Sequence, residues 1–177
     1  MPHYIAFLRG INVGGARVLK MESLRRAFEP LGFSGIETFI ASGNVAFDSS
    51  IRSTARLEAM IGKRLQAALG YQVDTFVRTH AELRAIADYR AFPASKLKAA
   101  ELYIIFLGVS PNAGAKQKLK SLQTGTDEFR AHGREVYWLR SRKPGAVPYS
   151  TISLEKALAP PYTIRSAKTI RKIAEKY

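Results

Sequence analysis

The sequence predicts an α+β protein built from two ferredoxin-like halves and a C-terminal helix. Three observations support this class. Short apolar runs typical of strands alternate with apolar stripes at helical spacing. Over the first half the predicted order is β-α-β-β-α-β, the split βαβ arrangement. The same order returns over the second half, which indicates a structural duplication.

The first half begins with the apolar run His3–Leu8, which predicts a strand. Gly32 and Gly70 each follow an apolar helical stripe and are placed to end those helices. Ser53 is the expected cap of the second helix. The remaining elements predicted here are a helix over 21–31, strands at 36–41 and 45–47, a helix over 54–69 and a strand at 73–77.

A further helix follows, in which Thr79 and Glu82 have the spacing of a capping box. Residues 90–100 are predicted to be a connector, so we expect subdomains at 1–89 and 90–177. The elements predicted after the connector are strands at 102–107, 129–131, 136–139 and 162–164, and helices over 113–122, 152–158 and 167–176. Arg78-Thr79 and Arg165-Ser166 occupy matching places between a strand and a helix.

Charge is the most informative feature of the composition. The 28 Lys and Arg residues exceed the 14 Asp and Glu residues, which gives a net charge of +14. Residues 113–177 hold 14 basic and 5 acidic residues, so most of the excess lies there. Such a field attracts phosphate-bearing partners, and it also keeps many proteins in solution without any specific role.

The composition also excludes several classes of protein. The chain has no cysteine, so disulfides, thiolate nucleophiles and cysteine zinc sites are absent. We see no signal-peptide pattern, and the longest apolar run, 102–109, is too short to cross a bilayer. We therefore expect a cytoplasmic protein with no membrane partner.

The segment Arg9–Gly15 is the first candidate site, because it lies between a strand and a helix. Backbone amides of such a loop can hold an anion, and nearby cations would assist. The segment lacks the spacing of a phosphate-binding or dinucleotide-binding motif. The alternative is that its glycines only serve turn geometry.

The turn Ser42–Asn44 is the second candidate. In the split βαβ unit, the loop after the first strand and the turn after the second lie at one edge of the sheet. We therefore expect the turn and the loop to converge on a phosphate or carboxylate. The candidate ligand-binding residues are Arg9, Asn12, Gly14, Gly15, Lys20, Ser42, Gly43 and Asn44.

The C-terminal basic segment is the third candidate. Spacings of three and four residues put several of its cations along one side of the last helix, opposite Ile170 and Ile173. Its members are Arg140, Arg142, Lys143, Arg165, Lys168, Arg171 and Lys172. They form either a surface for a polyanion or an ordinary solvated helix face.

Catalytic and metal-binding patterns are missing. His3, His80 and His132 are isolated in the sequence, so we predict no metal and no cofactor. No nucleophile-elbow motif is present, and the carboxylates are scattered. Tyr4, Phe7 and Phe47 lie on strands where an RNA-recognition fold stacks bases, but the third strand lacks that fold's signature, so we expect core packing for Phe7 and Phe47.

Two segments, Leu8–Gly15 and Thr38–Phe47, resemble the signature of domain of unknown function family 1697, a group of small, mainly bacterial proteins. The resemblance extends over nearly the whole chain. It implies a two-part α+β fold with a ferredoxin-like first part, and it implies no activity. Positions shared with the family add Lys156 to the basic surface. Where the family pattern has Asn-Trp before the last helix, this chain has Ser166 and Ala167.

The leading hypothesis is a non-catalytic binder of an anionic partner, either nucleic acid or a phosphorylated metabolite. The alternative is an enzyme acting on a small phosphorylated or carboxylated substrate at the edge formed by 9–15 and 42–44. A third hypothesis is an interaction module whose matched residues only maintain the fold. The sequence leaves the ligand and the oligomeric state open.

Overall fold

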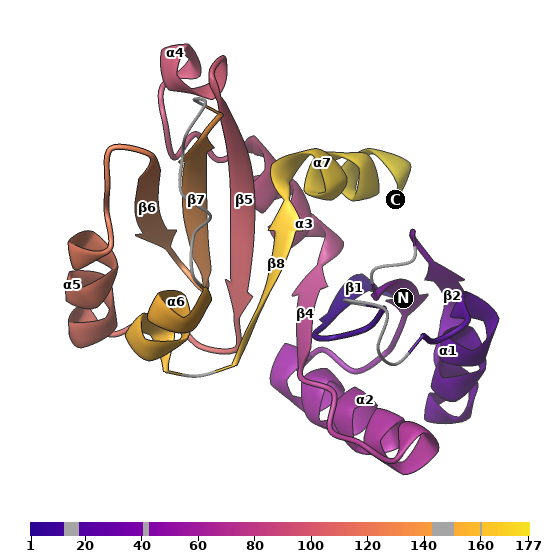
Figure 1. Cartoon of the computed structure of the whole chain (residues 1–177). Coiled ribbons are helices and arrows are strands. Elements are labelled where there is room, and N and C mark those ends of the chain that lie inside the picture. Colours follow the sequence, from indigo (N-terminus) through magenta and orange to yellow (C-terminus); the bar gives the residue numbers. More distant parts are fainter. Residues whose placement is uncertain (13–17, 41–42, 143–150, 160) are drawn as a thin grey trace. The chain divides into compact units, whose positions relative to one another are not determined.

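The computed structural model describes residues 1–177 except 13–17, 41–42, 143–150 and 160. The chain forms two compact units, one of Met1–Ala85 with Lys176–Tyr177 and the other of Ile86–Glu175 (Figure 1). Within the described ranges, none of the helices has the length and apolar character needed to cross a membrane.

The first unit contains a four-stranded antiparallel sheet in the order β2-β3-β1-β4. This order is that of the ferredoxin-like fold, as predicted. Its elements are β1 (His3–Leu8), α1 (Met21–Phe28), the short 3-10 helix η1 (Glu29–Leu31), β2 (Ser34–Thr38), β3 (Asn44–Asp48), α2 (Thr54–Leu69), β4 (Thr75–Thr79) and the beginning of α3 (His80–Asp88).

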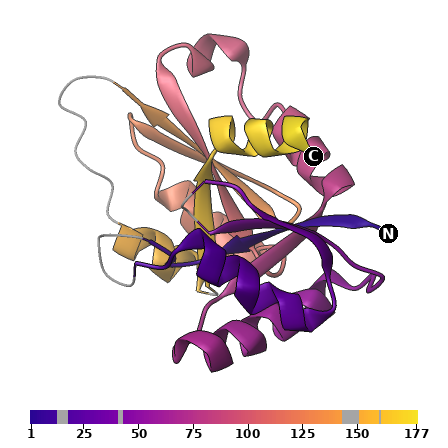
Figure 2. The same cartoon turned by 90° about the vertical axis from the view of Figure 1, so that its right-hand side faces the viewer.

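Helices α1 and α2 lie on one face of this sheet (Figure 2). Their buried apolar side chains, such as Leu24 and Leu57, pack against the inward residues Tyr4, Ala6 and Leu8 of the central strand β1. Each fully buried leucine contributes about 1.5–3 kcal/mol relative to exposure. The capping box predicted at the start of α3 is confirmed, because Thr79 Oγ1 accepts the Glu82 N–H at 3.1 Å and the Glu82 carboxylate accepts the Thr79 N–H at 2.8 Å.

The second unit repeats the arrangement with the order β6-β7-β5-β8. Helices α5 and α6 supply Leu119 and Leu154 to a core that contains Ile105, Leu107 and Trp138. The elements are the end of α3, α4 (Ala94–Leu97), β5 (Ala100–Leu107), α5 (Ala113–Ser121), β6 (Asp127–His132), β7 (Glu135–Ser141), α6 (Thr151–Leu158), β8 (Tyr162–Ser166) and α7 (Ala167–Lys176).

Strand register shows how closely the halves correspond. Ile5 on β1 pairs with Arg78 on β4, and Ile104 on β5 pairs with Arg165 on β8. Aligned this way, residues 4–8 and 103–107 both read Tyr-Ile-x-Phe-Leu. The predicted duplication is therefore confirmed at the level of topology and register.

Some predicted boundaries were wrong. The strand expected at 36–41 is β2, Ser34–Thr38, and the strand expected at 73–77 is β4, Thr75–Thr79. Ile40 adopts a positive φ of 48°, which cannot continue an extended strand. The connector expected at 90–100 contains the short helix α4 and the beginning of β5.

Candidate functional site

The loop after β1 meets the turn before β3, as the topology predicted. The Leu8 N–H donates to the Gly43 carbonyl at 2.8 Å. Gly43 has a φ of 73°, and a Cβ there would lie 3.0 Å from the Cβ of Ile11. Glycine is therefore required both for the backbone conformation and for the close approach of the two segments.

Two predicted ligands at this edge form hydrogen bonds that close the local backbone. The Asn12 side chain donates to the Leu19 carbonyl at 3.0 Å and accepts the Leu19 N–H at 2.6 Å. The Asn44 side chain is fully buried and donates to the Phe39 carbonyl at 3.0 Å. Both amides therefore support the fold of this edge.

The two predicted cations of this edge, Arg9 and Lys20, are accessible to solvent. Arg9 lies 3.8 Å from the Asp74 carboxylate, and Lys20 is exposed immediately before α1. Gly14, Gly15 and Ser42 lie outside the described residues. The binding role of the whole set stays a prediction.

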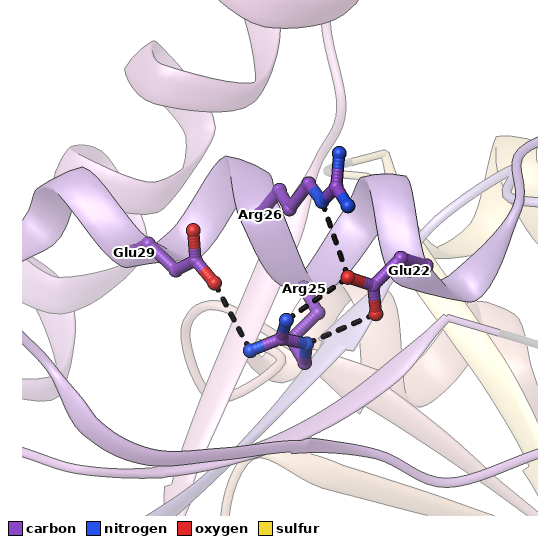
Figure 3. Close-up of polar contacts among 4 residues, drawn as sticks. All are labelled: Glu22, Arg25, Arg26 and Glu29. Atoms are coloured by element: carbon purple, nitrogen blue, oxygen red, sulfur yellow. Dashed lines mark hydrogen bonds and ion pairs between the residues drawn. The ribbon is translucent and has the colours of Figure 1, made fainter.

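Helix α1 carries cations that are already neutralised (Figure 3). Arg25 lies 2.9 Å from Glu22 and 3.0 Å from Glu29, and Arg26 lies 3.1 Å from Glu22. Hydrogen bonds from both arginines lower the pKa of the Glu22 carboxyl to about 2. These arginines therefore add little to an attractive field for an anion.

The predicted C-terminal basic residues separate into different environments. Arg165 is 9% exposed, and this burial lowers its pKa to about 10. The guanidinium of Arg140 lies 5.7 Å from the centre of the Trp138 ring. Lys156 and Lys172 are exposed on α6 and α7, and Lys143 lies outside the described residues.

Arg142, Lys168 and Arg171 line one pocket at the beginning of α7, which we call the α7 pocket. Its volume is about 330 Å³. The other lining residues are Leu97, Ala100, Glu101, Leu102, Tyr103, Ser166 and Ala167. The sequence-predicted basic surface thus contributes three cations to a concave site.

Hydrogen bonds order the polar groups of the α7 pocket. Ser166 Oγ accepts the Thr169 N–H at 3.1 Å and so caps α7. The Tyr103 hydroxyl donates to Glu101 at 2.7 Å, which raises the tyrosine's pKa, and Arg142 lies 3.5 Å from Glu101. Within the described part of the chain, Lys168 and Arg171 form no ion pair.

Comparison with protein-family models identifies the family to which this chain is related. The model described as "Protein of unknown function (DUF1697)" matches residues 1–137. The chain belongs to the DUF1697 family. This result confirms the resemblance found in the sequence.

A solved structure similar to this DUF1697 protein is that of the conserved bacterial protein SP0830 from Streptococcus pneumoniae. The TM-score is 0.70 at 24% sequence identity, over 98% of this chain and 97% of that one. The similarity supports the fold alone. Comparison with curated proteins finds no match.

The histidines of this DUF1697 protein are isolated in the sequence, but two of them approach each other in the fold, where the ring centres of His3 and His80 lie 6.3 Å apart. His3 Nδ1 lies 2.7 Å from the Asp48 carboxylate, and the His132 ring stacks on Tyr89. Over the described residues, no group of three or more His, Asp or Glu side chains is arranged to hold a metal ion.

Sequence reasoning missed Glu101, Tyr103 and Ala167 as members of the α7 pocket. Glu101 and Tyr103 lie on β5, more than sixty residues before α7. Only the pairing of β5 with β8, which matches Tyr103 with Ser166, brings these segments together. The Arg165-Ser166 pair, which matches Arg78-Thr79 between a strand and a helix, was the sequence feature that indicated the position of the α7 pocket.

Proposed function

We propose that this DUF1697 protein binds a phosphate-bearing partner in the α7 pocket and performs no chemistry on it. The partner is a phosphorylated small molecule or a nucleic acid, since both present the same charged group. The observation that carries the proposal is the gathering of Arg142, Lys168 and Arg171 around one concavity.

Electrostatics favour an anion in the α7 pocket. The three cations face one carboxylate, Glu101, so the lining keeps a positive excess. The pocket also lies at the N-terminal end of a ten-residue helix, where the helix dipole favours negative charge. Arginine and lysine together suit phosphate, since arginine binds two oxygens at once and lysine acts as a point charge.

The α7 pocket is poorly equipped for catalysis. Its lining has no histidine, and Tyr103 and Glu101 are hydrogen-bonded to each other. The raised pKa of Tyr103 keeps its hydroxyl protonated near neutral pH. The alternative enzyme at 9–15 and 42–44 is weakened because Asn12 and Asn44 are occupied by backbone hydrogen bonds.

Calorimetric titration with inorganic pyrophosphate and with a single-stranded oligonucleotide tests the proposal. The double variant Lys168→Gln/Arg171→Gln should weaken binding by roughly 100-fold or more, because hydrogen bonds to charged groups contribute about 1.5–3 kcal/mol each. Lys172→Gln is the matched control, because this lysine is exposed on the same helix and outside the pocket lining.

The two probes separate the two sources of phosphate. Binding of pyrophosphate indicates a small-molecule site. Binding of the oligonucleotide alone, with a steep salt dependence, indicates nucleic acid. Equal affinities for the double variant and the Lys172→Gln control would exclude the α7 pocket as the binding site.

A further inference from the structure

A second basic concavity lies beside β6, one of the two edge strands of the sheet in the second unit. We call it the β6 groove, and its volume of about 480 Å³ is in the range of small-ligand sites. It is lined by Tyr89, Lys116, Leu119, Lys120, Gln123, Glu128, Phe129, Arg130 and Ala131. None of these residues belongs to the α7 pocket.

An aromatic stack reaches the surface beside this groove. Tyr137 is buried, with 1% of its surface exposed, and its ring centre lies 4.9 Å from that of Tyr89. Tyr89 is 37% exposed and stacks on His132 with ring centres 4.0 Å apart and an interplanar angle of 13°. The stack therefore leads from a fixed, buried ring to an exposed one on the last residue of β6.

Three cations accompany the rings. Lys116 and Lys120 lie one helical turn apart on α5, and Arg130 extends from β6. Within the described residues none of the three forms an ion pair, whereas the only acidic lining residue, Glu128, lies 2.6 Å from Lys96. The groove therefore presents positive charge with little internal compensation.

The backbone of β6 is poorly suited to receive an added peptide strand. The Asp127 N–H donates to Thr124 Oγ1 at 3.0 Å, and the Asp127 carbonyl accepts the Thr124 N–H at 2.9 Å. The Phe129 carbonyl accepts the Gln123 side chain at 3.3 Å. Strand addition needs a run of open backbone groups, so rings and cations remain as the recognition elements.

We propose that the β6 groove binds single-stranded nucleic acid, with an unpaired base continuing the Tyr89–His132 stack and Lys116, Lys120 and Arg130 contacting the phosphates. Exposed aromatic rings beside a basic groove are how single strands are held without sequence preference. This proposal rests on the proposed function only because both assume a phosphate-bearing partner. The residues that bind the partner are different.

Fluorescence anisotropy with a labelled oligothymidylate strand tests the stacking. His132→Ala should weaken binding roughly 5- to 150-fold, the range for loss of one base–aromatic stack, because His132 is the exposed end of the stack, and His132→Phe should retain affinity. A strand of the same length without bases tests the same contact from the ligand side and needs no variant. If wild-type protein binds the abasic strand as tightly as oligothymidylate, the stacking proposal is wrong.

The charges are tested by salt titration. Lys116→Gln/Lys120→Gln should reduce the slope of log affinity against log salt by about 1.4, or 0.7 for each phosphate contact on a single strand. Lys118→Gln is the matched control, since it lies on the same helix but outside the groove lining. An unchanged slope in the double variant would contradict the proposal, as would equal binding of an acidic peptide and the oligonucleotide.

These outcomes are separable from failure of the α7 pocket. A Lys168→Gln/Arg171→Gln protein that loses pyrophosphate binding but still prefers oligothymidylate to the abasic strand supports the β6 groove. A protein in which His132→Ala changes nothing while the α7 variants abolish all binding supports the α7 pocket alone.

Discussion

Arg78 and Arg165 occupy the same register position in the two halves but have different surroundings. Arg78, 1% exposed, lies on β4 and is 3.8 Å from the Glu58 carboxylate. Glu58 also accepts the Val77 N–H at 2.8 Å. Arg165 lies on β8, where its guanidinium donates to the Thr163 hydroxyl and the Ile164 carbonyl at 2.8 Å each.

The two halves therefore share one topology but differ in the interactions that their buried arginines form. Both arginines bond to the carbonyl of the preceding residue, Val77 or Ile164. In the first half a buried ion pair accompanies that bond. In the second half burial lowers the arginine's pKa, and the helix that follows β8 borders the α7 pocket.

Substitutions in the two cores should have the largest effect on the free energy of unfolding, and they test whether the halves are equivalent in stability. Leu57 on α2 and Leu154 on α6 are both 0% exposed. Leu57→Ala and Leu154→Ala should each lower the free energy of unfolding by about 2–5 kcal/mol, because each leaves a cavity. Urea unfolding measures both. A loss below about 1 kcal/mol for only one variant would break the equivalence.

The buried arginines should differ in their contribution to stability. Arg78→Met should lower the free energy of unfolding by about 3 kcal/mol, because it leaves the Glu58 carboxylate without its buried cation. Arg165→Met should cost less, about 1–2 kcal/mol, because it removes the hydrogen bonds to the Thr163 hydroxyl and the Ile164 carbonyl together with the desolvation cost of a buried guanidinium. Equal losses in chemical denaturation would contradict the contrast drawn between the two positions.

The caps of α3 and α7 offer a smaller test. Thr79→Ala and Ser166→Ala each remove a side-chain oxygen that accepts a backbone N–H. Each should cost about 1 kcal/mol, with the larger loss at Thr79 because its hydroxyl also donates to the charged Glu82 carboxylate, whereas the Ser166 hydroxyl bonds the neutral Thr169 hydroxyl. Thermal unfolding of both variants gives the order, and a larger loss at Ser166 would reverse the expected ranking.

The smallest effect concerns the charges on α1 and α5. The pKa of Glu22 is lowered from 4.5 to about 2, so its stabilising contribution is present above about pH 4.5 and is lost as the pH falls through about 2. A carboxyl titration followed by NMR should show this depressed pKa in wild-type protein and a pKa closer to 4.5 in an Arg25→Gln/Arg26→Gln variant. Helix α5 has no acidic residue in its first turn and should show no such dependence.

The sequence predicted the elements of both halves other than α4 because apolar spacing and glycine stops are local signals. It misplaced β2 because the apolar pattern continues to Ile40, whereas the backbone leaves the extended region there. The residue type of Asn12 suggested a ligand but could not reveal that its amide closes the loop to Leu19. Hydrogen-bond partners of this kind depend on the folded path of the loop.

The β6 groove was beyond sequence reasoning for a different reason. Tyr89 follows α3, His132 ends β6, and the lysines belong to α5, so the groove joins three distant segments. The fold brings them together at β6, an outer strand of its sheet. No periodicity within one segment carries that information.

The shared Tyr-Ile-x-Phe-Leu run of β1 and β5 has a consequence for how the chain folds. Two near-identical central strands risk exchanging places, a typical misassembly of repeated domains. The single differing position is Ala6 in the first core and Ile105 in the second, both 0% exposed. Inserting Ile105 where Ala6 belongs would overfill that core at about 1–3 kcal/mol. One side chain thus helps a newly synthesised chain to assemble each sheet from its own strands.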